Sequence, residues 1–429
     1  MKKVSIFWFR RDLRIEDNHG LFQALSAQEP VLPLFIFDTN ILDRLPSKND
    51  VRVEFIHQSI TRLNEVIGGH LCVKQGDPIA IIQELLTQWD VVRIYTNHDY
   101  ERYGVARDAA VSALAQEKGF VFSTYKDQVV FEKDEVLSGA GTPYTVFTPY
   151  SRKWKALLAE MELPNFTSQE LKNYVSETFS IPSLTDIGFQ PSGLAFPQPD
   201  VQDELIKAYA QDRDFPAKPG TSRLSVHLRF GTISIRSLVR RALGKSEVWL
   251  NELIWRDFYF NIAFHFPHIG EGHSFRKEYD RMKWRNNEAE FKSWCEGKTG
   301  YPIVDAGMRE LNTTGFMHNR VRMIVASFLV KHLLIDWRWG EAYFAEKLLD
   351  FDFAANNGGW QWAAGSGCDA APYFRVFNPT LQTQKFDQAL TYIKKWVPEL
   401  QELTYPAPIV NHEFARGRVL AAYKEALGK

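Results

Sequence analysis

The sequence predicts a two-domain protein, with an α/β domain on a parallel sheet followed by an all-helical domain. The length of 429 residues is the first reason, because it exceeds what one compact core usually holds. The second is that short β-branched or aromatic runs alternate with amphipathic stretches in the first third of the chain. The third is that strand patterns nearly vanish in the second half, where helical periodicity continues.

Apolar runs in the first third predict five strands, at 4–9, 31–37, 71–75, 91–96 and 120–125. Helical periodicity between them predicts helices at 52–66, 78–88 and 103–118. This alternation is typical of a Rossmann-like parallel five-stranded sheet with helices on both faces, which we place at residues 1–126. Ligands of such sheets bind beyond the carboxyl ends of the strands. The segment Arg10–Arg14, directly after the first strand, is therefore placed where an anion or a ring could bind.

Prolines and glycines interrupt residues 127–197, apart from a short helical pattern at 150–160. We interpret this stretch as a long surface connection between the domains. Beyond it the periodicity predicts helices at 233–243, 248–265, 288–296, 304–312, 319–334, 340–349 and 386–395. Residues 198–429 should therefore form the all-helical domain.

Composition excludes several classes of protein. Hydrophobic residues make up 45% of the chain and charged residues 24%, which is typical of a globular protein. The three cysteines are far apart, so we expect neither a disulfide framework nor a metal site. The N-terminal apolar run is too short for a signal peptide, and no apolar stretch reaches the roughly 20 residues of a membrane span. We expect a cytoplasmic monomer with no membrane association and no obligate protein partner.

Charge and tryptophan are unevenly distributed along the chain. Residues 1–200 carry 20 Lys and Arg against 26 Asp and Glu, a balance of −6, whereas residues 201–429 carry 31 against 26, a balance of +5. The basic half favours a polyanion partner, although an ordinary solvated surface would give the same balance. Nine of the twelve tryptophans lie between positions 249 and 396, and core packing alone seldom clusters indoles in this way.

Residues 350–379 have a composition that no ordinary core segment needs. Acids, amides, paired glycines and two closely spaced tryptophans combine poor helix formers with a large aromatic surface. Glycine lets a backbone approach a flat ligand, amides and acids satisfy polar edges, and indoles offer stacking faces. The segment therefore predicts a site for a planar ring system with a polar rim.

A second set of candidate residues lies at 249–259. Trp249, Glu252, Trp255, Arg256 and Tyr259 are spaced so that they share one helix face. This mixture suits the wall of a cavity better than a dry core. An ion pair between Glu252 and Arg256 on a solvated face, with the aromatic residues in the core, explains the same spacing.

Two further segments could complete such a site. Residues 319–323 form a possible second wall, in which Arg322 could pair with Asp350 or Asp352, for orientation or for structure alone. Residues 219–225 contain a glycine turn and hydroxyls where a helix could begin. Backbone N–H groups at such a point suit a pyrophosphate, although simple N-capping by Thr221 or Ser222 is the commoner role.

Several motifs together resemble the DNA photolyase/cryptochrome family, and in particular class I cyclobutane pyrimidine dimer photolyases. They are Phe-Trp-Phe-Arg-Arg-Asp-Leu-Arg at 7–14, the segment 350–379, Phe-Asn-Pro-Thr at 377–380 and Gln-Lys-Phe-Asp at 384–387. The resemblance spans nearly the whole chain and keeps the order of the motifs. It implies that the helical domain binds FAD in a U-shape and acts on UV-damaged DNA.

The resemblance also implies roles for the residues that match the family's FAD-binding motifs. Those that would hold the phosphates and the ribityl chain are Tyr209, Thr221, Ser222, Leu224 and Ser225. Those that would line the flavin pocket are Trp249, Glu252, Arg256, Arg322 paired with Asp350, Asp352 at the pyrimidine edge, and Asn356 facing N5. A neutral amide beside N5 favours repair over signalling, because plant-type sensory cryptochromes carry an acid there.

Other matched positions would contact DNA. By the resemblance, the pocket for the extruded dimer would contain Glu252, Trp255, Asn319, Met323 and Trp362, and phosphates would be held by Arg213, Arg320 and Arg375. The six-four photolyases carry histidine where this chain has residues 319–323, so we rank their substrate lower.

The implied activity is that of a carbon–carbon lyase driven by light. Excited reduced FAD, FADH⁻, would donate an electron to the dimer, the cyclobutane bonds would split, and the electron would return. Trp360, Trp337 and Trp284 match the tryptophan chain through which the family photoreduces oxidised flavin, with Trp294 as an accessory. The alternative is a cryptochrome-type blue-light sensor that binds FAD without repair activity. An ordinary dark flavin oxidoreductase is disfavoured because the chain has no nicotinamide fingerprint.

The first domain of many class I enzymes holds an antenna chromophore. Residues 97–104 lack the Asn-Glu pair of folate-binding members, and Gly104 stands where the folate-binding acid would be. The segment looks more like the deazaflavin type. We therefore expect a deazaflavin-like antenna rather than a folate, or no antenna at all.

Overall fold

The computed structural model describes residues 2–428, which form two compact units. The sheet unit comprises the chain up to Glu132 together with Ala156–Asp200 and Arg223–Leu243. The helical unit comprises Lys133–Lys155, Val201–Ser222 and the chain from Gly244 onward. A parallel five-stranded sheet in one unit and helices in the other confirm the predicted fold class.

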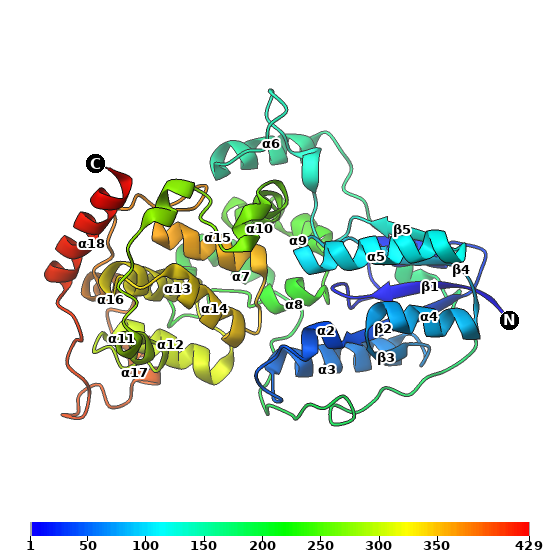
Figure 1. Ribbon diagram of the computed structural model, residues 1–429, viewed down its shortest axis with the longest axis horizontal. Helices are drawn as coiled ribbons and strands as arrows, with labels where there is room; N and C mark the ends of the chain where they lie inside the picture. The colour runs from blue at the N-terminus through cyan, green and yellow to red at the C-terminus, as the bar shows by residue number, and fades with distance from the viewer. Residues whose placement is uncertain (1, 429) are drawn as a thin grey trace. The chain divides into compact units, whose positions relative to one another are not determined.

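The sheet unit is built on five parallel strands in the order β3-β2-β1-β4-β5 (Figure 1). The strands are β1 Lys3–Phe9, β2 Val31–Asp38, β3 Cys72–Gly76, β4 Asp90–Asn97 and β5 Val121–Tyr125, each within one residue of its predicted bounds. The central strand β1 is buried from Val4 to Phe9, and in register Trp8 lies opposite Leu34 of β2. Burial on both faces explains why the central strands β1 and β2 are continuous apolar runs.

Seven α-helices among residues 2–428 belong to the sheet unit, and the first four of them and the last begin at a side-chain cap. They are α1 His19–Leu25, α2 Thr39–Leu42, α3 Val51–Val66, α4 Pro78–Gln88, α5 Arg102–Lys118, α8 Ser225–Phe230 and α9 Ile235–Ala242. Asn18, Asp38, Asp50 and Asp77 accept hydrogen bonds from the first backbone N–H groups of α1 to α4. The short helices α1, α2 and α8 were not predicted, because fewer than two turns show no clear periodicity.

A buried ion-pair network attaches α9 to the sheet unit. The Arg236 guanidinium donates to Asp127 at 2.8 Å and to Asp17 at 3.0 Å, and Arg14 donates to Asp127 at 2.8 Å. These four side chains are all less than a tenth exposed. Charges buried this deeply require their partners. Residues 223–243 therefore lie with the sheet, whereas the sequence placed them in the helical domain that begins at residue 198.

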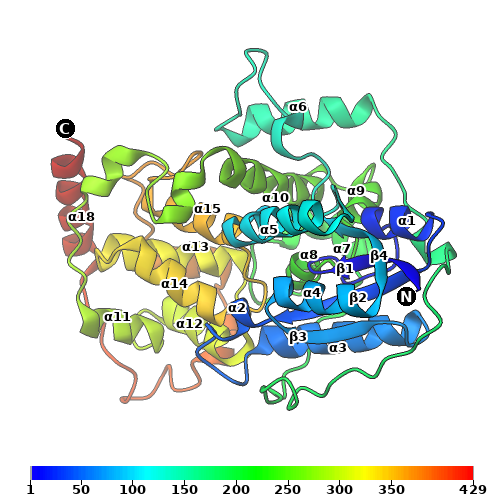
Figure 2. The same ribbon diagram turned by 45° about the vertical axis from the view of Figure 1, so that its right-hand side comes forward.

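The helical unit contains the remaining α-helices of the described residues. They are α6 Phe147–Ala159, α7 Asp203–Asp212, α10 Glu247–His265, α11 Glu288–Cys295, α12 Pro302–Thr314, α13 Asn319–Ser327, α14 Trp337–Lys347, α15 Phe353–Ala364, α16 Pro379–Phe386, α17 Thr391–Trp396 and α18 His412–Leu427. Helix α15 lies against α10, α13 and α14 (Figures 1 and 2). Of the helices in this unit, α10, α11 and α12 lie within two residues of their predicted bounds, whereas α7, α15 and α18 were not predicted.

Several predicted bounds in this unit differ from the structure. The helix expected at 319–334 is α13 followed by a π-helical turn, Phe328–His332. The helix expected at 386–395 corresponds to α17, which begins only at Thr391, whereas α16 already ends at Phe386. Residues 133–155, expected in the connection, belong to the helical unit, where Trp154 Nε1 donates to Asp257 Oδ2 at 3.0 Å. Periodicity detects the apolar face of a helix but not these tertiary anchors.

The core of the helical unit explains part of the tryptophan cluster. Trp294, Trp337 and Trp360 are each at most 2% exposed and pack among aliphatic side chains of α12 and α13. Gly340 lets α14 approach α15, since a Cβ at this position would lie 2.1 Å from the Trp360 ring. No helix among residues 2–428 has the length and apolar character needed to cross a bilayer.

Candidate functional site

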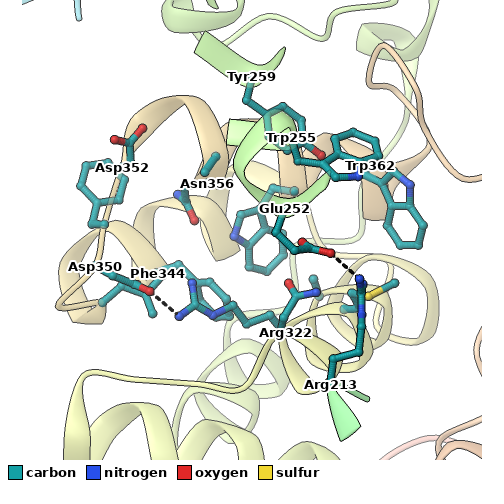
Figure 3. Close-up of a pocket in the computed structure, with 18 residues that line it drawn as sticks. Arg213, Glu252, Trp255, Tyr259, Arg322, Phe344, Asp350, Asp352, Asn356 and Trp362 are labelled. Atoms are coloured by element: carbon teal, nitrogen blue, oxygen red, sulfur yellow. Dashed lines mark hydrogen bonds and ion pairs between the residues drawn. The ribbon is translucent and has the colours of Figure 1, made fainter. Parts of the chain in front are cut away.

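The helical unit encloses a cavity of about 360 Å³ between α10, α13, α14 and α15 (Figure 3). Its walls bring together residues that are far apart in sequence. They are Arg213, Glu252, Trp255, Tyr259, Asn319, Arg322, Met323, Ala326, Phe344, Leu348, Asp350, Phe351, Asp352, Ala355, Asn356, Gly359, Trp360 and Trp362. The alternative in which Glu252 and Arg256 pair on a solvated face is not observed, because Glu252 faces the cavity and pairs with Arg213.

One wall of the cavity is α15, a helix in a segment where periodicity predicts none. Asp352 caps it by accepting a hydrogen bond from Ala354 N at 3.2 Å, and Gly365 ends it at φ 81°. The two glycines of the helix have different roles. A Cβ at Gly358 would lie 2.2 Å from the Tyr259 ring, so this glycine allows α10 to pack. A Cβ at Gly359 would meet no atom within 4 Å, so this glycine leaves the cavity open.

The polar end of the cavity is formed by Arg322 and Asp350. Arg322 Nη2 lies 2.8 Å from Asp350 Oδ2, and Arg322 Nε donates to Met317 O at 2.7 Å. Of the two carboxylates that the sequence offered, the structure pairs Arg322 with Asp350. The second oxygen, Asp350 Oδ1, is buried and has no hydrogen-bond partner among residues 2–428. An acceptor without a protein partner at the cavity wall is able to accept a hydrogen bond from a bound molecule.

Asn356 lies in the middle of the α15 wall. Its Nδ2 donates to Glu341 O at 3.1 Å, which fixes the amide beside the cavity. The next residue, Asn357, donates from Nδ2 to Glu341 Oε1 at 2.8 Å and accepts from Gln361 Nε2 at 2.9 Å. Glu341 thus holds both asparagines, one through its backbone and one through its carboxyl group. Burial raises the pKa of this carboxyl to about 7.

The pKa of Glu341 predicts how stability depends on pH. The folded protein keeps this carboxyl protonated up to about pH 7, whereas in the unfolded chain it ionises near 4.5. The free energy of unfolding should therefore fall as pH rises through that window. Glu341→Gln cannot ionise and keeps the acceptor for Asn357. It should be more stable than wild type at about pH 8, by up to about 3 kcal/mol, and equal to it near pH 4.

Thermal unfolding across this pH range measures the difference. The matched control is Glu346→Gln, which removes an exposed carboxyl of the same helix. Parallel stability curves for wild type and Glu341→Gln would show that the Glu341 carboxyl is ionised in the fold.

The other end of the cavity carries two indoles and an ion pair. Trp255 and Trp362 line it, and beside them Glu252 pairs with Arg213 (Figure 3). Burial raises the pKa of Glu252 above its ordinary value, and the nearby Arg213 charge opposes this rise. Phe147, at the start of α6, stacks on Trp255 with ring centroids 3.7 Å apart and planes 4° from parallel. No sequence pattern pointed to Phe147, since it lies in the segment interpreted as a connection.

Some predicted site residues do not line this cavity. In the helical unit these are Tyr209, Thr221, Ser222, Trp249, Arg256, Trp284, Arg320, Trp337 and Arg375, and in the sheet unit they are Leu224 and Ser225 at the start of α8. Trp249 is buried in the core, and the Arg256 guanidinium lies 4.7 Å from the Phe260 ring centroid. Tyr259, predicted on the same helix face as Glu252, lines the cavity, whereas the cavity residues Phe344 and Phe351 were not predicted. Their aromatic character was visible, but only the tertiary packing turns them inward.

The predicted tryptophan chain is placed as follows. Trp360 lines the cavity, Trp337 is 1% exposed and Trp284 is partly exposed. The ring of Trp294, expected as an accessory, lies 6.1 Å from the Trp360 ring at an angle of 70°. No group of three or more His, Cys, Asp or Glu side chains that could hold a metal ion occurs among residues 2–428.

Comparisons with known proteins match the whole chain. The family model described as "DNA photolyase" matches residues 5–168, and "FAD binding domain of DNA photolyase" matches residues 249–404. A deoxyribodipyrimidine photo-lyase of Synechococcus is 39% identical over 99% of this chain and 97% of that protein.

Two solved structures are also similar over nearly their whole length. A class III photolyase from Agrobacterium tumefaciens has a TM-score of 0.88 and 34% identity, covering 100% of this chain and 98% of that one. An archaeal photolyase from Sulfolobus tokodaii, solved with two FAD molecules, has a TM-score of 0.85 and 37% identity, covering 99% of this chain and 100% of that one. FAD is accordingly the cofactor of this chain, and the matched FAD-binding segment contains most of the residues that line the cavity.

Proposed function

The chain belongs to the DNA photolyase family, and we propose that it uses light and FAD to split cyclobutane pyrimidine dimers in DNA. The observation that carries this proposal is the cavity itself. Its polar end offers an unpartnered buried acceptor, and its other end offers two indoles and a carboxyl group. The motifs resemble class I enzymes, whereas the Agrobacterium structure is a class III enzyme, so we propose the reaction and assign no class.

The residues at the polar end fit a flavin ring. Gly359 leaves space at the α15 wall, and Asp350 Oδ1 needs a donor that the protein does not supply. We propose that Arg322 and Asp350 hold the ring, with Asp352 at its pyrimidine edge and Asn356 beside N5. Tyr209, Thr221, Ser222, Leu224 and Ser225 would hold the phosphates and ribityl chain. Bound and reduced as FADH⁻, the cofactor supplies an electron to the dimer when it absorbs light.

The residues at the other end fit an extruded pyrimidine pair. Enzymes that act on a base take it out of the stack and bind it in a pocket. Trp255 and Trp362 offer flat apolar faces for the two rings, and Glu252 offers a polar group for the carbonyl edge. Asn319 and Met323 complete this wall from α13. We propose that Arg213, Arg320 and Arg375 contact DNA phosphates, which positions the duplex without reading its sequence.

Light-dependent repair of an oligonucleotide tests the proposed function. The purified protein, reduced in advance, should remove a single thymine dimer under blue light and leave it intact in darkness. A protein that binds FAD but removes no dimers would instead be a cryptochrome-type sensor. The intact set of Glu252, Trp255 and Trp362 at the cavity favours the enzyme.

Phe147 should contribute to substrate affinity through Trp255. Phe147→Ala removes the ring that covers one face of this indole, so Trp255 would lose a defined orientation. An aromatic pair of this kind is worth about 1 kcal/mol, which corresponds to about fivefold weaker binding of a dimer-containing oligonucleotide. Fluorescence anisotropy measures the affinity. Phe147→Tyr, which keeps the stacked ring, should bind like wild type. Unchanged affinity of Phe147→Ala would remove Phe147 from the site.

For the antenna we propose a deazaflavin-type chromophore rather than a folate, or no second chromophore. A side chain at Gly104, where folate-binding members carry an acid, would lie 2.4 Å from Asp99. The helix α5 therefore leaves no room for that acid without movement of Asp99. Chromophore extraction from the purified protein tests this expectation, and a stoichiometric folate would contradict it.

A further inference from the structure

An ion pair at the cavity joins two residues for which we propose different partners. Arg213 follows directly after α7, and Glu252 lies on α10. Their side chains form an ion pair at the end of the cavity that Trp255 also lines (Figure 3). Both side chains are about a third exposed, at 28% and 32%. They are therefore accessible to a ligand from solvent. Glu252 is suited to a base edge, and Arg213 is suited to a phosphate.

A second carboxylate lies beside the same guanidinium. Asp214 Oδ1 accepts from Arg320 Nη2 at 2.7 Å and lies 3.9 Å from Arg213 Nε. A carboxylate between two guanidinium groups is the arrangement in which Arg side chains also bind a phosphate. Asp214 is itself 37% exposed, so its contacts with both arginines are open to competition. In the free protein, Arg213 and Arg320 thus both face the Asp214 carboxylate, an anion that a DNA phosphate would replace.

The charge of Glu252 depends on Arg213. The titratable and charged groups that act on Glu252 or share its cavity are Arg213, Asp214, Tyr209, Tyr259, Arg322, Asp350 and Asp352. Burial and Asp214 favour the protonated acid, whereas Arg213 favours the carboxylate both by its charge and by its hydrogen bond. If Arg213 moves to another anion, the balance shifts toward the acid. An ionised carboxylate only accepts hydrogen bonds, whereas the acid also donates one.

We propose that Arg213 is shared between Glu252 and a DNA phosphate, so that backbone binding releases Glu252 to take up a proton from solvent. The protonated carboxyl then donates a hydrogen bond to a carbonyl oxygen of the extruded pyrimidine pair. This inference rests on the proposed function, since it requires a flipped lesion in the cavity. Arg213 acts in it as a positioning residue, because it controls the protonation of Glu252 without contacting the lesion.

The coupling has a measurable consequence for specificity. Undamaged DNA pairs a phosphate with Arg213 but places no carbonyl group beside Glu252. Its binding is therefore not strengthened by a hydrogen bond from the protonated carboxyl group. Damaged DNA gains the hydrogen bond only when a proton is also bound. The preference for dimer-containing DNA should therefore fall with rising pH, at a limiting slope of about tenfold per pH unit.

Dark binding measurements with the FAD-loaded protein test the inference. Two otherwise identical oligonucleotides, with and without one thymine dimer, are titrated from about pH 5 to about pH 8.5. Calorimetry in two buffers of different ionisation enthalpy gives the number of protons taken up on binding. Wild type should take up close to one proton with the damaged strand, and its preference for that strand should fall as pH rises.

Two neutral variants separate the coupling from a structural role. Glu252→Gln should bind without proton uptake and with a preference that does not change with pH. Arg213→Gln leaves Glu252 protonated before DNA arrives, so proton uptake should disappear while the preference for the dimer remains. The affinity of Arg213→Gln for DNA should fall. The slope of its log binding constant against log salt concentration should be smaller by about one phosphate contact. Flavin content and circular dichroism verify that both variants are folded.

The results distinguish failure of this inference from failure of the proposed function. If wild type prefers the dimer but takes up no proton, or if Glu252→Gln still takes one up, the coupling is wrong and the repair activity stands. If wild type shows no preference for the dimer at any pH and repairs none in light, the proposed function itself is wrong.

Discussion

Replacing Arg322 with methionine should cost about 3 kcal/mol of stability and abolish retention of FAD. The Asp350 side chain is only 6% exposed, and its Oδ1 atom already lacks a hydrogen bond. The substitution also removes the charged partner of this carboxylate. An unpaired carboxylate at this depth has to be neutralised or solvated, and either response distorts the cavity. Thermal unfolding and the flavin absorbance of the purified variant measure the two effects.

A double variant separates charge burial from cofactor binding. Arg322→Met combined with Asp350→Leu removes both charges, so it should recover most of the lost stability. It should not recover FAD, because the groups proposed to hold the ring are then absent. If the double variant retained FAD like wild type, Arg322 and Asp350 would be a structural pair with no role in the cofactor site.

Replacing Trp360 with phenylalanine should slow photoreduction of oxidised flavin by more than about tenfold, equivalent to about 1.4 kcal/mol in the barrier. Trp360 is the one predicted chain member that lines the cavity, so it is the first donor for a cofactor bound there. Phenylalanine keeps an aromatic ring against Gly340 but lacks the readily oxidised indole. Flash photolysis of the oxidised protein measures the rate of photoreduction.

Repair by the chemically reduced variant is the matched measurement. It should remain close to wild type, because the proposed electron route from cofactor to dimer does not pass through Trp360. Trp89→Phe, in the sheet unit, controls for the loss of an indole and should change neither activity. Equal loss of photoreduction and repair in Trp360→Phe would show that Trp360 shapes the cavity rather than supplying electrons.

The sheet could be predicted closely because its signal is local. The central strands β1 and β2 are short runs that are buried on both faces, so their apolar character marks their own bounds. Helices α10 and α12 were predicted because each has several turns over which the pattern repeats, whereas α18, which is also long, was not predicted. The placement of α9 was not predictable, because it depends on Arg236 pairing with Asp17 and Asp127 from distant parts of the chain.

The candidate site was predictable in composition more than in geometry. The mixture of acids, amides and indoles in 350–379 pointed to a polar-rimmed ring, and the cavity contains Asp352, Asn356 and Trp360 from that segment. The helical form of this segment could not be predicted from asparagines and paired glycines. Two contacts stabilise the helix: the Asp352 cap, which is local, and the packing of Gly358 on Tyr259, which is tertiary.

The sequence by itself determined the class of fold, the kind of ligand and most of the chemically active side chains. Residue type and spacing carry this information, because burial and hydrogen-bonding capacity are properties of each side chain. Only the tertiary structure decided which of these side chains meet. It paired Glu252 with Arg213 rather than Arg256, Arg322 with Asp350 rather than Asp352, and it set Phe147 against Trp255. Such choices depend on how helices distant in sequence pack, and no local pattern records that packing.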